Sequence, residues 1–213
     1  FLKPIRNIPG NTDEQQRILA ATVCFKGIQP IRLISAYFPN GQSPDSDKFQ
    51  YKLGWLVALE DWLKEELTQN SRLALLGDFN IAPTDDDVHD PSKWVGQNLV
   101  SPPEREAFQK LLNLGLTDSF RMFEQAPKSF SWWDYRMAGF RRNLGLRIDL
   151  VRLRRRDRQI LTEHEPQATR PHEGLRGLEA CDLCKSQHGR SVDGRPTRVA
   201  HADGRLFQRV AQS

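Results

Sequence analysis

The aromatic residues of this chain end almost completely before Arg152, and this boundary limits where a hydrophobic core can form. All five Trp, all three Tyr and ten of the eleven Phe come before Arg152, and only Phe207 follows it. Aromatic and large aliphatic side chains supply most of the apolar area that a core buries. Of the 213 residues, we therefore expect 1–151 to form a folded domain and 152–213 to be an atypical tail.

Charge changes at the same boundary. Residues 1–151 carry a net charge of −1 and residues 152–213 a net charge of +5, which gives the formal charge of +4. Arg supplies 12 of the 13 basic residues of the tail. Few periodic apolar residues accompany them, so we expect this Arg-rich tail to be disordered. The positive balance is a weak indication of a polyanionic partner.

Composition excludes several classes of protein. No apolar run approaches the roughly 20 residues that a membrane-spanning helix needs, and mean hydropathy is −0.62. Three Cys do not make a disulfide framework. We therefore expect neither a membrane protein nor a disulfide-rich secreted scaffold, and the cysteine usage favours a reducing compartment such as the cytoplasm.

The first 151 residues alternate between strand and helix patterns. We expect strands over 19–26, 31–38, 73–77 and 146–153, and helices over 46–67 and 101–115. At the start of the second helix, Ser101 and Glu104 have the spacing of a capping box. This alternation predicts an α/β layered domain.

The segment Gly77-Asp78-Phe79-Asn80-Ile81-Ala82-Pro83 offers the most chemistry. In an extended backbone, Asp78 and Asn80 point to one side and Phe79 to the other. A carboxylate there can take a proton from water or hold a divalent metal, while the amide can donate to a phosphate oxygen. The alternative is an Asx turn that merely ends a strand.

Tyr37 ends the second expected strand, directly before a Pro39-Asn40-Gly41 turn. A phenol at a strand end can donate a hydrogen bond to a phosphoryl group or, as phenolate, attack it. The alternative is that the ring only packs.

Two other clusters resemble metal sites. One is the acidic loop of residues 85–90, where the alternative is a solvated loop. The other is the pair Cys181 and Cys184 followed by His188, which has half the spacing pattern of a zinc site. A regular second half is absent from the sequence, so chance pairing in a biased tail is the competing interpretation.

Aromatic and basic residues interleave over 130–142, from Phe130-Ser131-Trp132-Trp133-Asp134-Tyr135-Arg136 to Arg141-Arg142. This pattern is typical of nucleic-acid contact, in which rings stack on bases and guanidinium groups bind phosphates. The alternative is a Trp pair in the core. Downstream, Asp149 lies in a strand and could orient a His partner.

These segments, in order, resemble the exodeoxyribonuclease III family of apurinic/apyrimidinic endonucleases. The likeness covers about residues 13–151. Its motifs are Tyr37-Phe38-Pro39-Asn40-Gly41, the Gly77–Pro83 segment, Asp86-Asp87-Val88-His89-Asp90-Pro91, Ser131-Trp132-Trp133-Asp134-Tyr135-Arg136 and Gly145-Leu146-Arg147-Ile148-Asp149.

The resemblance implies an α/β fold of the endonuclease/exonuclease/phosphatase type, a four-layered sandwich of two mixed sheets flanked by helices. It implies Mg²⁺- or Mn²⁺-dependent hydrolysis of DNA phosphodiesters 5′ of abasic sites, with 3′-to-5′ exonuclease and 3′-end cleaning activity. The implied partner is double-stranded DNA with abasic sites or 3′ ends. We expect a monomer without membrane contact, in a bacterial-type cytoplasm and associated with the nucleoid.

The resemblance also implies residue roles. Asp78 is expected as the general base or acid, Asn80 as the transition-state stabiliser, and both as metal ligands. Tyr37 is expected as the active-site phenol, and Asp149 as the carboxylate that orients a catalytic His. The DNA-binding residues expected around the base-less sugar are Trp132, Arg136 and Leu146. The acidic loop over 85–90, with His89, is expected to be structural.

The sequence departs from the family pattern at both ends. The family's opening Trp-Asn strand, its metal-binding Glu motif and its closing Ser-Asp-His are not found. From this we expect 1–151 to be a partial nuclease domain and 152–213 to be translated from a shifted reading frame or to come from a gene fragment. Two alternative functions follow: a catalytically incomplete relative that at most binds DNA, and a phosphodiesterase of the same fold that acts on RNA or phospholipid.

Overall fold

The computed structural model describes residues 4–11 and 13–154. The chain separates into two units, Phe1–Cys181 and Asp182–Ser213, and every described residue lies in the first. The expectations for the tail beyond Arg154, and for zinc at Cys181, Cys184 and His188, lie outside the described residues.

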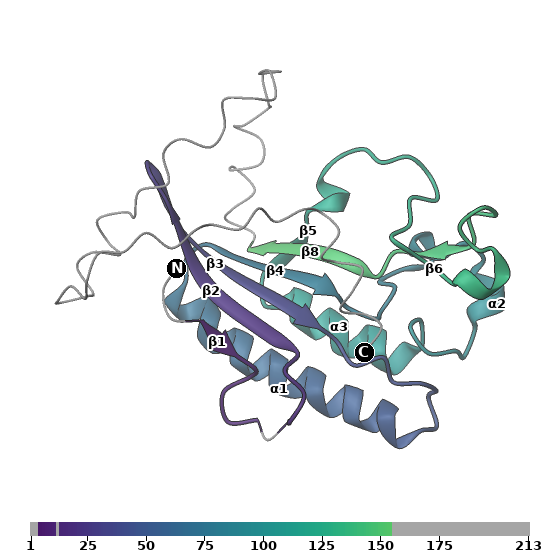
Figure 1. Cartoon of the computed structure of the whole chain (residues 1–213), viewed down its shortest axis with the longest axis horizontal. Helices are drawn as coiled ribbons and strands as arrows, with labels where there is room; N and C mark the ends of the chain where they lie inside the picture. Colours follow the sequence, from purple (N-terminus) through teal and green to yellow (C-terminus); the bar gives the residue numbers. More distant parts are fainter. Residues whose placement is uncertain (1–3, 12, 155–213) are drawn as a thin grey trace, which may run out of the picture. The chain divides into compact units, whose positions relative to one another are not determined.

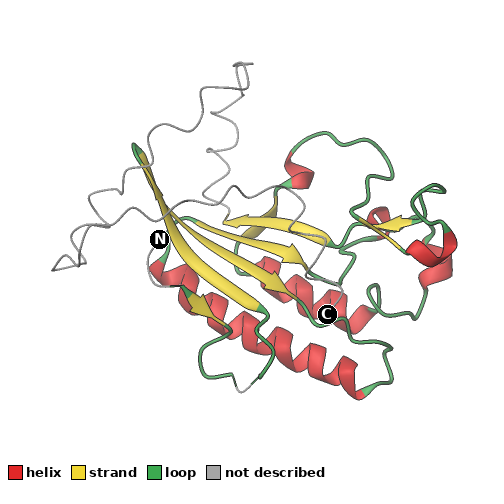
Figure 2. Cartoon of the chain, in the orientation of Figure 1, coloured by secondary structure: helices red, strands yellow, loops and turns green. Residues whose placement is uncertain are grey.

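A six-stranded mixed sheet forms the centre of the described unit (Figure 2). Only β3 and β4 pair in parallel, and the other pairs are antiparallel. In spatial order the strands are β1 (Ile5–Arg6), β2 (Ile18–Phe25), β3 (Ile28–Tyr37), β4 (Leu73–Asp78), β8 (Asp149–Arg154) and β5 (Leu116–Asp118). The strands expected over 19–26, 31–38 and 73–77 are confirmed to within a few residues.

Two helices, α1 (Asp47–Gln69) and α3 (Pro102–Asn113), cover one face of this sheet (Figure 1). A parallel strand pair needs a crossover connection, and α1 provides it between β3 and β4. α1 begins after Ser46, whose side chain accepts a hydrogen bond from the backbone N–H of Phe49. α3 begins with the expected capping box, in which Glu104 Oε1 accepts from both the N–H and the hydroxyl of Ser101.

The main core lies between the sheet and these helices. Its buried residues come from the helix-facing positions of β2, β3, β4 and β8 and from α1 and α3. At its centre the ring of Phe79 stacks on Phe38 at 4.3 Å between centroids and meets the edge of Phe108 at 5.6 Å. Phe79 therefore anchors the residues that immediately follow β4.

A second sheet contains only two described strands, β6 (Trp132–Trp133) and β7 (Gly145–Leu146). It packs with a smaller apolar cluster that includes Val88, Leu146 and Ile148. The short elements η1 (Asp85–Asp87), α2 (Pro91–Trp94), η2 (Phe120–Met122) and η3 (Tyr135–Met137) occupy the connections.

The expected strand over 146–153 is wrong as a single element. Leu146 ends β7 in the small sheet, and β8 begins at Asp149 in the large one. Arg147, between them, donates its backbone N–H to Asp87 O at 2.9 Å and directs its guanidinium at Asp87 and Asp118. Because of these bonds, residues 147 and 148 connect the two sheets and are not part of a continuous strand.

The face of the large sheet away from α1 and α3 carries exposed apolar side chains. Leu19, Val151 and Tyr37 are among them, on β2, β8 and β3. Strand β8 also runs past the expected domain boundary, because Arg152 and Leu153 are buried within it. No helix in the described ranges is long and apolar enough to span a bilayer.

Candidate active site

Three strands each bring one polar side chain to the same level of the large sheet. Tyr37 on β3 is the register partner of Asp78 on β4, and Asp78 is the register partner of Asp149 on β8. Residues directly opposite one another on paired strands share a face of the sheet. Tyr37, Asp78 and Asp149 therefore form a row across three neighbouring strands, on the face away from the helices.

Gly77 permits the close approach that creates this row. Its φ of +134° is open only to glycine, and an added Cβ would lie 2.1 Å from the backbone oxygen of Ala36. Any side chain at position 77 would therefore push β4 away from β3. The level of Asp78 beside Tyr37 depends on this glycine.

Asp78 and Asn80 lie side by side, as expected. The Asn80 backbone N–H donates to Asp78 Oδ1 at 2.8 Å, and Asn80 Nδ2 lies 3.3 Å from Asp78 Oδ2. The first of these bonds is an Asx turn, so the alternative weighed from the sequence coexists with the paired carboxylate and amide. Asn80 takes a left-handed φ of 48°, which orients its side chain back toward Asp78 while Phe79 faces the core.

Asn40, which sequence reasoning did not assign to the site, fixes the orientation of the Asn80 amide. The backbone N–H of Gln42 donates to Asn40 Oδ1 at 3.1 Å, so Asn40 Nδ2 faces Asn80 and donates to its Oδ1 at 2.9 Å. Asn80 Nδ2 then donates to the carbonyl of Phe38 at 3.0 Å. The backbone N–H of Gln42 at one end and the backbone oxygen of Phe38 at the other therefore fix which side-chain atom of Asn40 and of Asn80 is the nitrogen and which is the oxygen. The turn signal at Pro39-Asn40-Gly41 was the only hint of this role.

The carboxyl of Asp78 is electrostatically unusual. Its pKa is raised to about 6, mainly by burial and also by the charge of Asp149, while the Asn80 backbone N–H and the charge of Lys52 act in the opposite direction. Loss of hydration also raises the pKa of Asp149, against hydrogen bonds from Ser131 and its own backbone. Over the described residues, neither carboxylate forms an ion pair.

This arrangement suits proton transfer and hard cations. A carboxyl with a pKa near 6 can accept a proton close to neutral pH. Carboxylate and amide oxygens are the donors that Mg²⁺ prefers, and here Asn80 turns its Nδ2 toward Asp78 and its Oδ1 toward Asn40. The described ranges hold no group of three or more His, Cys, Asp or Glu that could bind a metal. Asp78, Asn80 and Asp149 can therefore supply part of a coordination shell, with water and substrate oxygens as the rest.

Tyr37 lies at one end of the row and Asp149 at the other, and both residues are exposed, whereas Asp78 between them is partly buried. The side chain of Tyr37 is 50% exposed, and the guanidinium carbon of Arg17 lies 5.5 Å from its ring centroid. The phenol is thus accessible to a ligand above the sheet, and the neighbouring cation favours an anionic one. Sequence reasoning did not identify Arg17.

The structure includes one histidine among the described residues, His89, and it does not contact Asp149. Its Nδ1 lies 3.2 Å from the carbonyl oxygen of Gly145. The role of Asp149 in orienting a catalytic His therefore stays a prediction. The described carboxylate that Asp149 faces is Asp78.

The acidic loop over 85–90 is held by arginine in its most buried part. Asp87 is 1% exposed and pairs with Arg147 and Arg121, each at 2.6 Å. Burial raises the pKa of Asp87, but hydrogen bonds from both arginines and Thr84 and the charge of Arg147 outweigh it, leaving the pKa below its ordinary value. The solvated-loop reading is thus wrong for Asp87, and its oxygens are occupied by cationic side chains.

The expected DNA-binding residues lie at the small sheet. Trp132 on β6 is half-buried and is the register partner of Leu146 on β7, which is completely buried. Arg136 is exposed and bonds to Asp134 through its Nη2 at 2.7 Å. Tyr135 and Phe140 on the same loop are strongly exposed. Trp132 and Leu146 are therefore neighbours, Arg136 is on the surface beyond them, and the contact of all three with DNA stays a prediction.

The mixed sheet with one helix-covered face defines an α/β protein, and the row of polar strand ends on its other face is the candidate site. Residues 3–196 match the model of the Endonuclease/Exonuclease/phosphatase family, and the chain belongs to this family. The fold class expected from the sequence is confirmed. Of its two expected sheets, the described residues contribute one large sheet with helices on one face and the two strands of a second.

Known relatives confirm the resemblance to exodeoxyribonuclease III. The chain is 36% identical over 150 residues to the exodeoxyribonuclease III of Haemophilus influenzae, which covers 66% of this chain and 55% of that protein. It matches the structure of the 3′ phosphatase NExo from Neisseria bound to a product DNA hairpin, with 43% identity, a TM-score of 0.67, and coverage of 71% and 58% of the two chains. An AP endonuclease from Archaeoglobus fulgidus matches at 29% identity and a TM-score of 0.63, over 71% and 57%. The chain thus spans about half the length of the curated relatives it matches.

Proposed function

We propose that this chain carries the catalytic centre of a DNA-repair nuclease that hydrolyses phosphodiesters 5′ of abasic sites. Exonuclease action from 3′ ends and removal of blocked 3′ groups belong to the same proposal. The observation that carries it is the row of Tyr37, Asp78 and Asp149 across three paired strands, with Asn80 in hydrogen-bond reach of Asp78. The relatives named exodeoxyribonuclease III and AP endonuclease support this substrate class.

The geometry supports a role for each residue in this proposal. Asp78 accepts the proton of the attacking water, because its pKa of about 6 leaves it ionised but basic at neutral pH. Asn80 Nδ2 exchanges its long 3.3 Å contact with Asp78 for a phosphate oxygen on which negative charge develops. Tyr37 donates a hydrogen bond from its phenolic O–H to the same phosphate. Asp149 keeps the local electrostatic potential negative, which attracts a cationic group.

The proposed cofactor is Mg²⁺, with Mn²⁺ as a substitute. Asp78 and Asn80 would hold it, and Asp149 faces the same position. The residues fit a divalent cation because two carboxylates with raised pKa values oppose each other with no described Lys or Arg paired to either. Such an ion supplies Lewis-acid stabilisation of the phosphoryl oxygens.

The proposed partner is double-stranded DNA bound by a monomer. Trp132 would line the pocket for the base-less sugar, with the buried Leu146 as its neighbour on β7 shaping that pocket from behind, and Arg136 would contact phosphate. Exposed rings and cations on the adjoining loop add to this surface: Tyr135, Phe140, Arg141 and Arg142. A substrate of this kind would place the protein in the cytoplasm, at the nucleoid.

Incision of a labelled duplex that contains one abasic site tests the proposal. We expect cutting with Mg²⁺, no cutting with EDTA, and a loss of about 10²- to 10⁴-fold in Asp78→Asn, the range for removal of a general base. Asp90→Asn is the matched control, because Asp90 is an aspartate outside the row and pairs with Lys93. Full activity of Asp78→Asn would contradict the proposed role.

A second candidate is a relative that binds DNA without cleaving it. The absence of a group of three acidic, His or Cys ligands over residues 4–11 and 13–154 favours it. Tight binding of the abasic duplex without incision under any divalent metal would support this alternative. Equal or faster cleavage of RNA or a phosphoinositide would instead favour a different substrate for the same site.

A further inference from the structure

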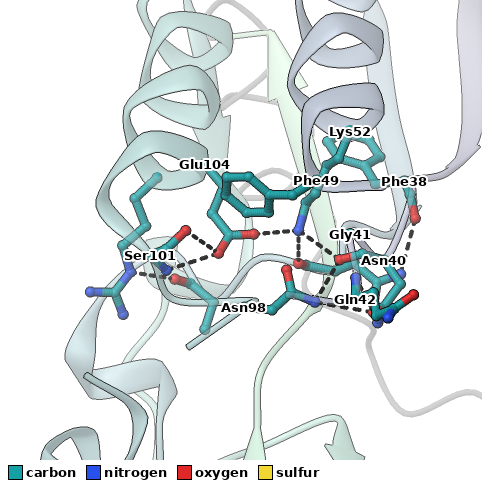
Figure 3. A network of polar contacts seen from close by, with 12 residues as sticks. Phe38, Asn40, Gly41, Gln42, Phe49, Lys52, Asn98, Ser101 and Glu104 are labelled. Carbon is teal, nitrogen blue, oxygen red and sulfur yellow. Dashed lines mark hydrogen bonds and ion pairs between the residues drawn. The ribbon is translucent and has the colours of Figure 1, made fainter. Parts of the chain in front are cut away.

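A completely buried lysine lies behind the site, on the helix side of the sheet. Lys52 on α1 is 0% exposed, and its Nζ donates to the backbone oxygen of Asn80 at 2.8 Å and of Asn40 at 3.2 Å (Figure 3). Its third hydrogen bond is an ion pair with Glu104 on α3. All three ammonium donors are therefore used, and two of them go to the residues whose side chains form the amide pair of the site.

Glu104 is as firmly held as its partner. It is also 0% exposed, and its other carboxylate oxygen accepts from the backbone N–H of Ser101 at 2.8 Å and from the Ser101 hydroxyl at 2.7 Å. The pair thus connects α1 and the capped start of α3 to the two loops that follow β3 and β4. Neither helix can shift relative to those loops without breaking a buried charged hydrogen bond.

The loop that packs against Lys52 has a glycine at the point of contact. Gly41 has a φ of +91°, and a Cβ there would lie 3.0 Å from Lys52 Cδ and 3.0 Å from Asn98 Oδ1. Asn98 Nδ2 in turn donates to the backbone oxygen of Asn40 at 2.7 Å and to its side-chain oxygen at 3.0 Å. The Asn40 loop is therefore held by hydrogen bonds from two side chains, those of Lys52 and Asn98.

We propose that Lys52 is a positioning residue for the site, which holds the Asn40 and Asn80 carbonyls together so that the amide of Asn80 keeps its orientation. Asn80 has a left-handed φ, which a non-glycine residue adopts at a cost and keeps only when its surroundings enforce it. Without the ammonium, the Asn80 carbonyl loses its side-chain donor, the Asn40 carbonyl keeps only the one from Asn98, and the two loops are no longer tied to each other through Lys52. The catalytic meaning of this positioning rests on the function proposed for the site.

A second buried ion pair provides the matched control. Arg32 on β3 bonds to Glu66 on α1 through two nitrogens, at 2.7 and 3.1 Å, and both side chains are 8% exposed. It connects the same helix to the same sheet but contacts no residue of the site. A purely stabilising role would make the loss of Lys52 and the loss of Arg32 equivalent.

Amide hydrogen exchange separates the two roles without relying on turnover. The probe is the Asn80 N–H, which is bonded to Asp78, referred to the N–H of Leu75 in the middle of β4. In Lys52→Met we expect Asn80 to exchange at least about tenfold faster relative to Leu75 than in the unaltered chain, which is a local opening. In Arg32→Met we expect the ratio to stay unchanged, because both amides report the same global loss of stability.

Glu104→Gln covers the case in which Lys52→Met does not fold, since its amide oxygen can keep both Ser101 bonds while its Nε2 no longer accepts a hydrogen bond from Lys52. The Asn80-to-Leu75 ratio should rise in the same direction and by less. An unchanged exchange ratio in Lys52→Met overturns the proposal. If only Glu104→Gln folds, an unchanged ratio in that variant overturns it instead. An equal rise of the ratio in Arg32→Met also overturns it.

If the unaltered chain cleaves DNA, kcat of Lys52→Met should fall about 10- to 100-fold with KM nearly constant. An inactive unaltered chain refutes the proposed function alone, and the exchange ratio still decides the role of Lys52.

Discussion

Two sets of carboxylates lie on neighbouring parts of this molecule, and their partners differ completely. Asp87 and Asp118 are buried against cations: Asp87 bonds to Arg121 and Arg147, and Asp118 to Arg147 and Arg152. Asp78 and Asp149 face each other across β4 and β8, with no ion pair among the described residues. The pKa of Asp87 is accordingly lowered, whereas the pKa values of Asp78 and Asp149 are raised.

This difference separates scaffold from site better than the density of acidic residues does. The acidic loop over 85–90 has the richer sequence of carboxylates, yet its buried member already has its cations built into the fold. The sparser pair at Asp78 and Asp149 is left with uncompensated negative charge, which costs stability and is available to a metal or a proton. Neutralised carboxylates therefore fix the structure here, and uncompensated ones mark the candidate chemistry.

The largest stability effect should come from breaking the neutralised set. Arg147→Met leaves Asp87 and Asp118 buried without their shared guanidinium, so we expect the free energy of unfolding to fall by about 3–5 kcal/mol. Urea unfolding at pH 7 followed by circular dichroism measures it. A loss below about 1 kcal/mol would place this network with surface ion pairs and would remove one side of the comparison.

The opposite sign is expected at the uncompensated set. The folded pKa of Asp78 lies above its ordinary value of 3.8, so ionisation of Asp78 lowers the free energy of unfolding. The full free energy of unfolding is present below pH 3.8, and part of it is lost as pH rises through about 6. Asp78→Asn removes this loss and still offers an oxygen to the Asn80 N–H. The variant should be more stable than the unaltered chain by roughly 2–3 kcal/mol at pH 8 in EDTA.

The pH dependence provides the control for that stabilisation. The difference between Asp78→Asn and the unaltered chain should shrink as pH falls through 6 and vanish only well below pH 3.8, where Asp78 is protonated in both the folded and the unfolded state. Urea titrations at several pH values would reveal it. A gain that stays constant from pH 4 to pH 8 would trace the effect to packing and not to charge.

The stabilisation by bound Mg²⁺ should be smaller than the effect of Asp78→Asn. Mg²⁺ at ten times its dissociation constant should stabilise the unaltered chain by about 1.4 kcal/mol and Asp78→Asn much less. Thermal unfolding with and without Mg²⁺ compares them. Equal stabilisation of both proteins would mean that the cation binds elsewhere.

The smallest effect should come from an exposed pair. Arg136 and Asp134 are bonded at 2.7 Å on the surface of the 134–144 loop, where solvent screens their charges. Arg136→Met should leave the unfolding temperature unchanged, while it weakens the affinity for abasic duplex in a filter-binding assay. A clear drop in the unfolding temperature would show that this arginine is part of the scaffold.

Local patterns predicted much of this site. The placement of Asp78 beside Asn80 was predicted correctly from adjacent residues, although an Asx turn with a left-handed Asn80 produces it and not the expected extended backbone, and the capping box of Ser101 and Glu104 is equally local. The strand over 146–153 was wrong because the partners of Arg147 are distant, Asp87 by 60 residues and Asp118 by 29. Lys52 escaped notice for the same reason, since 28 residues separate it from Asn80 and its helical position reads as an ordinary surface lysine.

The comparison itself is tested most directly by the carboxyl pKa values of Asp78 and Asp87, measured by NMR from the pH dependence of their side-chain ¹³C shifts in metal-free protein. We predict that Asp78 titrates at about pH 6 and that Asp87 stays ionised below its ordinary value of 3.8. In Asp78→Asn, the titration near pH 6 should disappear. If Asp78 and Asp87 both titrate close to 3.8, the division into neutralised and uncompensated carboxylates is wrong.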